Sequence, residues 1–207
     1  MENLMELSNM ERDALRECAN VGIGNAATAL SKLLKKKINI QIPETKFIPL
    51  ESFAEDLGGP EKIVSGIYLQ IQGDLRGEVL FIFAKEEAVE LINLLLGNIE
   101  VKSGDNSDLE ESGFKEMSNI VTGSYLNAMA NMLDIKILPS IPHTATDMLQ
   151  ALVDHILIEL GKYSDDVLTV KTQIDVEGHN VKGTFVIIFT ADSLKVIMSK
   201  LHEKYGV

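Results

Sequence analysis

The chain has 207 residues, of which 45% are hydrophobic, so it can bury a substantial core as one compact unit or as two half-sized repeats that share a core. Its formal net charge of -12 at pH 7 repels phosphate backbones and anionic lipid, which argues against nucleic-acid and membrane-surface roles. Other proteins are the expected partners.

The N-terminus reads MENLMELSNMERD, which is acidic from its second residue and has no basic start, so we expect no signal peptide. No apolar run approaches the roughly 18 residues that a spanning helix needs, and we expect a cytoplasmic protein. The single cysteine, Cys18, excludes an internal disulfide and a cysteine-based metal cluster. We interpret Cys18 as a buried helix residue rather than a nucleophile.

The first hundred residues begin with helical periodicity over about 8–35 and a short β-branched run over about 37–42. After a less regular stretch, strands are predicted over about 62–72 and 77–84, followed by a helix over about 85–96. The loop QGDLRG between these two strands contains Gly and Asp, which supply the backbone angles of tight turns, so it predicts an antiparallel hairpin.

The second half follows the same order, and its loop DVEGHNVKG predicts another antiparallel hairpin. The elements expected there are a helix over about 107–134, strands over about 135–139, 153–162, 166–176 and 182–190, and a helix over about 191–204. The first half has three predicted strands, so three of these four strands would be enough to repeat its order of elements.

Two pairs of segments show that the chain repeats itself. The segment ECANVGIGNAATALSKLL from Glu17 aligns without gaps on EMSNIVTGSYLNAMANML from Glu116, an offset of 99 residues. Farther on, GEVLFIFAKEEAVELI from Gly77 aligns with GTFVIIFTADSLKVIM from Gly183. Such self-similarity indicates one structural plan used twice.

The repeat predicts an α+β fold with pseudo-twofold symmetry. Each half would be an α-β-β-β-α unit, with boundaries at about 1–100 and 101–207. Because no Pro/Ser/Gly-rich linker separates the halves, we expect a single domain with one shared core. A mainly antiparallel sheet and two long surface helices complete the expected architecture.

A narrow polar stripe is predicted on the first helix. At 100° per residue, Asp13, Glu17, Asn20 and Gly24 fall within about 60° of one another. The opposite face carries small and apolar residues that would pack on the core: Leu15, Cys18, Ala19, Gly22, Ala26, Ala29 and Leu30. The stripe is therefore expected to face solvent.

The second long helix repeats the stripe as Ser112, Glu116, Asn119 and Gly123. Glycine inside a helix costs about 1 kcal/mol against alanine, so its presence at equivalent places calls for a reason. Either a partner approaches the Glu and Asn side chains closely, or the two helices pack tightly at the glycines. An Asn amide both donates and accepts hydrogen bonds, so it could hold a water molecule and orient it.

Both stripes fit one spacing: Asp or Ser, three residues, Glu, two residues, Asn, twenty-two residues, Pro. This pattern resembles the signature of the CheC/CheX/FliY family of chemotaxis phosphatases, and the resemblance extends over essentially the whole chain. The two copies are Asp13, Glu17, Asn20 and Pro43, and Ser112, Glu116, Asn119 and Pro142. Two intact copies favour the CheC branch, since CheX usually keeps one. We expect no FliN-like domain of the kind that a FliY protein carries.

The resemblance implies a phosphatase that hydrolyses the aspartyl phosphate of a CheY-type response regulator. Glu17 and Glu116 would each pair with a lysine of the regulator, and Asn20 and Asn119 would orient the attacking water. The regulator would supply Mg²⁺, so this chain would bind no cofactor of its own. Positioning provides most of the rate in phosphoryl transfer, which agrees with so small a set of groups.

A non-enzymatic alternative stays open, in which the chain is a binding module for the receptor deamidase CheD. In the family, the CheD contact lies on a short helix after the second proline, which here resembles TATDMLQAL with Asp147. The first half has IPLESFAEDL instead, so the contact would be asymmetric. In either case we expect a monomer.

Three other interpretations are set aside. GIGNAA from Gly22 matches a dinucleotide-binding fingerprint, but the residues before it are helical where that motif requires a strand. The four histidines lack metal-ligand spacing. Glu17 and Glu116 lie on predicted exposed faces, which offer no apolar pocket of the kind that raises the pKa of a hydrolase acid.

Overall fold

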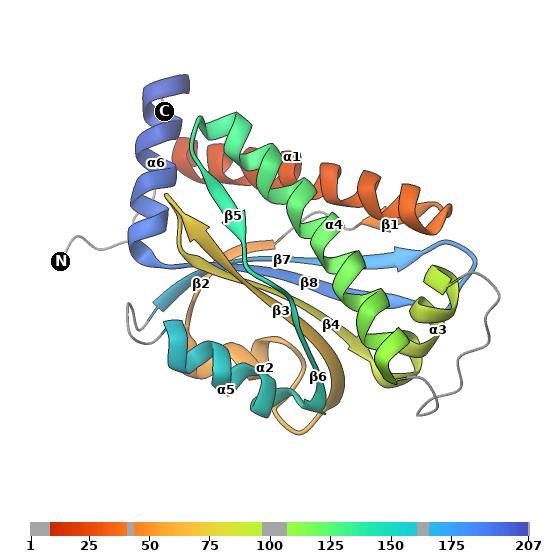
Figure 1. Ribbon diagram of the computed structural model, residues 1–207. Coiled ribbons are helices and arrows are strands. Elements are labelled where there is room, and N and C mark those ends of the chain that lie inside the picture. The colour runs from red at the N-terminus through yellow and green to blue at the C-terminus, as the bar shows by residue number, and fades with distance from the viewer. Residues whose placement is uncertain (1–8, 41–43, 97–106, 161–165, 207) are drawn as a thin grey trace.

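The computed structural model describes residues 9–40, 44–96, 107–160 and 166–206 (Figure 1). The elements are α1 (Asn9–Leu34), β1 (Ile38–Ile40), β2 (Glu44–Pro49), a 3₁₀ turn (Leu50–Ser52), α2 (Phe53–Asp56), β3 (Ile63–Gly73), β4 (Gly77–Ala84), α3 (Lys85–Leu96), α4 (Ser107–Leu133), β5 (Ile137–Pro139), β6 (His143–Met148), α5 (Leu149–Leu160), β7 (Asp166–Val176), β8 (Lys182–Phe189) and α6 (Ala191–Tyr205). No helix among these residues is long and apolar enough to cross a membrane.

One eight-stranded sheet joins the two halves of the chain. Its order is β1-β7-β8-β4-β3-β5, with β2 also beside β7 and β6 also beside β3. The pairs β3–β4 and β7–β8 are the two predicted hairpins, and all the pairs described are antiparallel. Strands of each half pair with the other half at both ends of the sheet and at its centre, where β4 lies beside β8. The predicted α+β class with an antiparallel sheet is confirmed.

Helices cover both faces of the sheet, so two apolar clusters form instead of the single core that we predicted. On β4, Val79, Phe81 and Phe83 belong to one cluster, while Leu80 and Ile82 belong to the other, because successive side chains of a strand point to opposite faces. The larger cluster lies under α1, α3, α4 and α6, and the smaller one under α2 and α5 (Figure 1). Each cluster draws side chains from both halves of the chain.

Among the described residues, each half contains four strands and an additional helix, so the predicted α-β-β-β-α unit is wrong. The missing strands, β2 and β6, lie beside only one neighbour each. The exposed side chains of β6 give no alternation to recognise. The short strand β2 ends at Pro49, and proline argues against a central strand. The order helix, two strands, helix, two strands, helix occurs in both halves. Their pseudo-twofold symmetry stays a prediction.

The segment predicted as a strand over 153–162 is part of helix α5 through Leu160. Its buried positions are spaced three and four residues apart, which is the helical period. They are Leu149, Leu152, Val153, Ile156 and Leu160. Apolar runs of this length do not distinguish a strand from a buried helix by composition alone.

Helices α1 and α4 lie side by side over the sheet and pack closely at one glycine (Figure 1). A Cβ atom on Gly22 would lie 2.4 Å from Cε2 of Tyr125. The Tyr125 ring is fully buried and also contacts Phe185 edge to face, with the ring centroids 5.8 Å apart. The ring therefore has little room to move, and Gly22 lets α1 approach α4.

We predict opposite stability effects at two glycines of the same helix. Gly22→Ala should lower the free energy of unfolding by about 1–3 kcal/mol, because the added methyl group overpacks the core against Tyr125. Gly24→Ala should raise it by up to about 1 kcal/mol, because no atom lies within 4 Å of the added Cβ and alanine is the better helix former. Urea denaturation followed by circular dichroism measures both. Equal shifts in the same direction would contradict the packing described.

Candidate functional site

The stripe predicted on α1 faces solvent. Asp13, Glu17, Asn20 and Gly24 are all exposed, whereas the opposite side of the helix is buried in the larger cluster. Of the seven residues predicted for the buried face, only Ala29 is half-exposed, because it lines a surface groove between α1 and α4. The period of the helix and the burial of one face therefore place the four stripe residues together on the outer surface.

The polar groups of the α1 stripe are available to a partner. The carboxylates of Asp13 and Glu17 and the amide of Asn20 make no hydrogen bond or ion pair with any residue in the described part of the chain. Glu17 and Asn20 are three residues apart, so they lie one above the other on the helix surface. A partner that approaches α1 would meet one acceptor for a cation and one amide that can both donate and accept.

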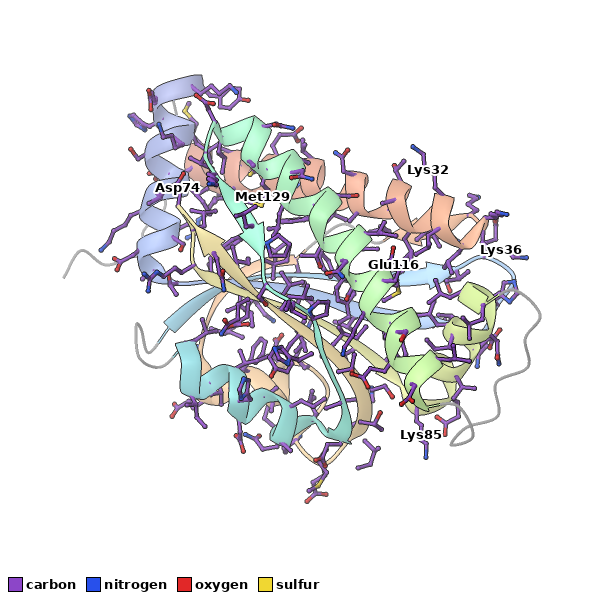
Figure 2. All side chains as sticks on the ribbon, viewed as in Figure 1. Lys32, Lys36, Asp74, Lys85, Glu116 and Met129 are labelled. Atoms are coloured by element: carbon purple, nitrogen blue, oxygen red, sulfur yellow. The ribbon has the colours of Figure 1, made fainter. Side chains whose placement is uncertain are left out.

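The α4 stripe is built in the same way, with one difference in charge. Glu116 lies where α4 passes over the sheet (Figure 2), and both Glu116 and Asn119 are exposed, without a hydrogen bond or ion pair among the described residues. Ser112 is exposed too, but its hydroxyl donates to the Asp108 carbonyl oxygen of its own helix at 2.7 Å. The α1 stripe therefore presents two carboxylates, and the α4 stripe presents one.

The glycines of the two stripes border open space. A Cβ atom on Gly24 or Gly123 would meet no atom within 4 Å. The two helices therefore do not pack at these positions, and tight helix packing is not the reason for either glycine. The glycine at which α1 packs closely on α4 is Gly22. At Gly24 and Gly123 the absence of a side chain leaves the helix backbone accessible beside the Glu and Asn side chains.

Cys18 lies directly behind the α1 stripe and has no reactive character. Its side chain is buried, and burial, together with the negative charge of Glu17, raises the pKa of the thiol to about 12. Nucleophilic attack requires the thiolate, which such a pKa suppresses at neutral pH. The prediction of a buried helix residue is confirmed.

Each copy of the motif contains one proline. Pro142 is buried between β5 and β6. Pro43 lies outside the described residues.

The predicted position of Asp147 on a short helix is wrong. Asp147 lies on the edge strand β6, where it pairs with Val64, and α5 begins only at Leu149. It is exposed, and its Oδ1 accepts a hydrogen bond from the Met148 backbone N–H at 2.7 Å. A docking surface centred on Asp147 would therefore be a strand edge rather than a helix face.

Sequence reasoning missed an apolar groove that borders the α1 stripe. It has a volume of about 720 Å³ and lies between α1, the end of α4 and the end of α6. Its lining residues are Met10, Asp13, Ala14, Glu17, Val21, Met132, Leu201 and Tyr205. Residues so far apart in sequence give no local pattern, and an exposed Tyr near the end of an amphipathic helix was the one available signal.

No group of three or more His, Cys, Asp or Glu side chains in the described ranges is placed to hold a metal ion. The two stripes present carboxylates and amides on exposed helix surfaces. Such groups can pair with a cation and orient a water molecule, but they do not enclose a substrate.

Comparisons with known proteins identify the family of this chain. A family model described as the CheC-like family matches residues 10–46, which include the whole α1 stripe. CheY-P phosphatase CheC of Bacillus subtilis is 32% identical over 171 residues, which cover 82% of this chain and 82% of that protein. The crystal structure of Thermotoga maritima FliY has a TM-score of 0.75 at 22% identity and covers 97% of this chain and 100% of that chain, which supports the fold. The chain belongs to the CheC-like family.

Proposed function

We propose that this chain is a phosphatase that hydrolyses the aspartyl phosphate of a CheY-type response regulator. The observation that carries the proposal is the pair of exposed Glu/Asn stripes, whose polar groups have no hydrogen-bond or ion-pair partner in the described part of the chain. The names of two relatives, CheY-P phosphatase CheC and flagellar motor switch phosphatase FliY of Bacillus subtilis, support the same activity.

In the proposed mechanism the chain inserts a helix surface into the regulator. Glu17 or Glu116 pairs with a lysine of the regulator and fixes the register of docking. Asn20 or Asn119, one turn farther along, accepts a hydrogen bond from a water molecule and holds it in line with the phosphorus–oxygen bond that breaks. The attacking water adds to phosphorus as the aspartate oxygen leaves, so inorganic phosphate and a free carboxylate result.

The proposed mechanism requires few groups from this chain, so it is suited to a site on an exposed helix surface. Phosphoryl transfer asks little covalent chemistry of the protein, and holding the reactants in line supplies much of the rate acceleration. The Mg²⁺ that neutralises the phosphoryl oxygens belongs to the regulator, so the stripes need no ligands for it. Gly24 and Gly123 leave space for the regulator backbone beside the Asn and Glu side chains.

We further propose that the two stripes are independent catalytic sites of one monomer in the cytoplasm. The halves, about 1–100 and 101–207, would be internal repeats of a single domain. Each stripe lies on its own helix, so each would engage its own regulator molecule. The losses caused by substitutions in the two stripes should then be additive in rate.

We predict that only the double substitution abolishes hydrolysis. Asn20→Ala or Asn119→Ala alone should remove the activity of one site. By analogy with positioned hydrogen-bond donors in other enzymes, the loss should be on the order of 10²–10³ in the rate of that site, or about 2.7–4 kcal/mol. Asn20→Ala with Asn119→Ala should reduce the decay of the phosphorylated regulator in Mg²⁺ to its own rate. Folding should persist, because exposed Asn→Ala substitutions favour a helix.

The matched control is Asn131→Ala, which changes an exposed asparagine near the end of α4, more than three helical turns beyond Asn119. It should retain full activity, and circular dichroism should show all four variants folded. A folded double variant as active as the wild type would show that the stripe amides are not catalytic.

We also predict that Gly24→Ala, which should stabilise the free protein, weakens binding of the regulator. In a chain that carries Asn119→Ala and so acts through the α1 stripe alone, Gly24→Ala should raise the KM for the phosphorylated regulator about tenfold. A methyl group that overpacks an interface costs about 1–3 kcal/mol, while the free protein has space for it. Steady-state kinetics of the folded variant provide the measurement. An unchanged KM would mean that no regulator atom approaches Gly24 closely.

The alternative of a CheD-binding module depends on the strand edge around Asp147. Met148, the neighbour of Asp147, is exposed. Ile63 on β3, which pairs with Met148, is exposed too. An acidic side chain beside exposed apolar ones is compatible with a protein contact. The two functions are compatible because β6 and the stripes belong to different elements.

We predict that Asp147→Lys weakens capture of CheD in a pull-down and leaves phosphatase activity within about twofold of the wild type. The charge reversal should be tolerated because Asp147 is exposed and exposed substitutions usually change stability by about 0.5 kcal/mol or less. Equal capture before and after the reversal would remove Asp147 from the CheD contact.

A further inference from the structure

The apolar groove beside the α1 stripe has walls that the rest of the fold holds in place. The Lys204 ammonium near the end of α6 donates to the Met132 carbonyl oxygen at the end of α4, with a distance of 2.8 Å. Leu201 is fully buried in the larger cluster and forms the floor. The groove is therefore formed before any partner arrives.

The groove exposes apolar side chains that a soluble surface would ordinarily cover. Met10 is 59% exposed on the α1 side and Tyr205 is 52% exposed on the α6 side. Two large apolar side chains that face one groove of about 720 Å³ provide a seat for one large apolar side chain of another protein.

The same groove has an acidic rim. Asp13 and Glu17 line it, and their carboxylates have no hydrogen-bond or ion-pair partner among the described residues. A cation that binds here would be attracted by both carboxylates, and no described residue of the chain already pairs with them. An apolar seat next to two unpaired carboxylates is complementary to a segment in which a large apolar residue neighbours a Lys or Arg.

We propose that this groove is a docking subsite for the phosphorylated regulator, which places a large apolar side chain between Met10 and Tyr205 while its neighbouring basic residue pairs with Asp13 and Glu17. This inference rests on the proposed function, because it assigns the groove to the partner of the α1 stripe. The groove adds affinity and takes no part in the chemical step.

The corresponding region of α4 is built differently. Gly113 is the counterpart of Ala14 in the repeat, and a Cβ there would lie 3.3 Å from Cδ1 of Ile92 on α3. Ser112 takes the place of Asp13 and donates to its own helix. The proposal therefore assigns the apolar contact to the α1 stripe alone, which makes the two sites unequal in affinity for one regulator.

The test uses chains that act through one stripe each: Asn119→Ala for the α1 stripe and Asn20→Ala for the α4 stripe. Met10→Ser with Tyr205→Ser removes both exposed walls of the groove. In the Asn119→Ala chain this pair should raise the KM about tenfold and leave kcat unchanged. In the Asn20→Ala chain it should change neither constant.

Two controls address structural explanations. Tyr205→Phe keeps the ring and should retain the original KM. Leu109→Ser changes the exposed counterpart of Met10 on α4, and it should leave the Asn119→Ala chain unaffected. Binding of the regulator loaded with beryllofluoride, a stable mimic of the phosphoryl group, should show the same tenfold weakening as the KM.

The outcomes distinguish the two levels of the account. If neither single-stripe chain hydrolyses the phosphorylated regulator, the proposed function fails and the groove assignment fails with it. If both chains are active and the groove substitutions leave KM and beryllofluoride-regulator binding unchanged, only the groove assignment is overturned. A shift in oligomeric state by light scattering, with unchanged regulator binding, would assign the groove to a second copy of this chain and also overturn the inference.

Discussion

The contact between α1 and α4 at Gly22 and Tyr125 is the constraint on which both candidate sites depend. A Cβ on Gly22 would collide with a ring that is itself fully buried, so this contact fixes how closely the two helices approach. Because successive residues of a helix advance by about 100°, burying one face of α1 leaves Asp13, Glu17 and Asn20 no position except the outer surface. The same argument applies to α4, and the sheet beneath the two helices holds both in place through one apolar cluster.

The exposure of both stripes limits what the proposed phosphatase could do by itself. An exposed carboxylate and amide cannot enclose a small substrate or exclude water from it, so under the proposed function the regulator would supply the cleft, the phosphoryl group and its metal ion. Specificity then depends on docking. The α1 stripe carries an additional carboxylate and borders the apolar groove, while Ser112 of the α4 stripe bonds to its own helix. Two copies of one motif have thus acquired different surroundings, which provides a physical route to sites of unequal affinity on one chain.

The sequence predicted the two stripes because helical periodicity, a second copy and the opposite apolar face all indicated the same orientation. The hairpins followed from turn residues between strong strand patterns. The edge strand β6 was missed because its exposed side chains show no alternation, and β2 was missed because proline argues against a strand. Helix α5 was misassigned because a short apolar run fits a strand as well as a buried helix. Asp147 was placed on a helix because the family resemblance was carried over to TATDMLQAL, in which the strand β6 continues through Met148. The groove could not be predicted, since Met10 and Tyr205 meet only after the whole chain has folded.

The central claim is that each stripe is a complete docking site for one regulator molecule, and the stoichiometry of the complex tests it most directly. Light scattering coupled to size-exclusion chromatography would give the mass of the complex between the wild-type chain and a beryllofluoride-loaded CheY-type regulator. The account predicts two regulator molecules per chain at saturation, and one when Glu17→Lys or Glu116→Lys reverses the charge of a single stripe. Two regulators bound to the chain that carries both reversals would contradict it.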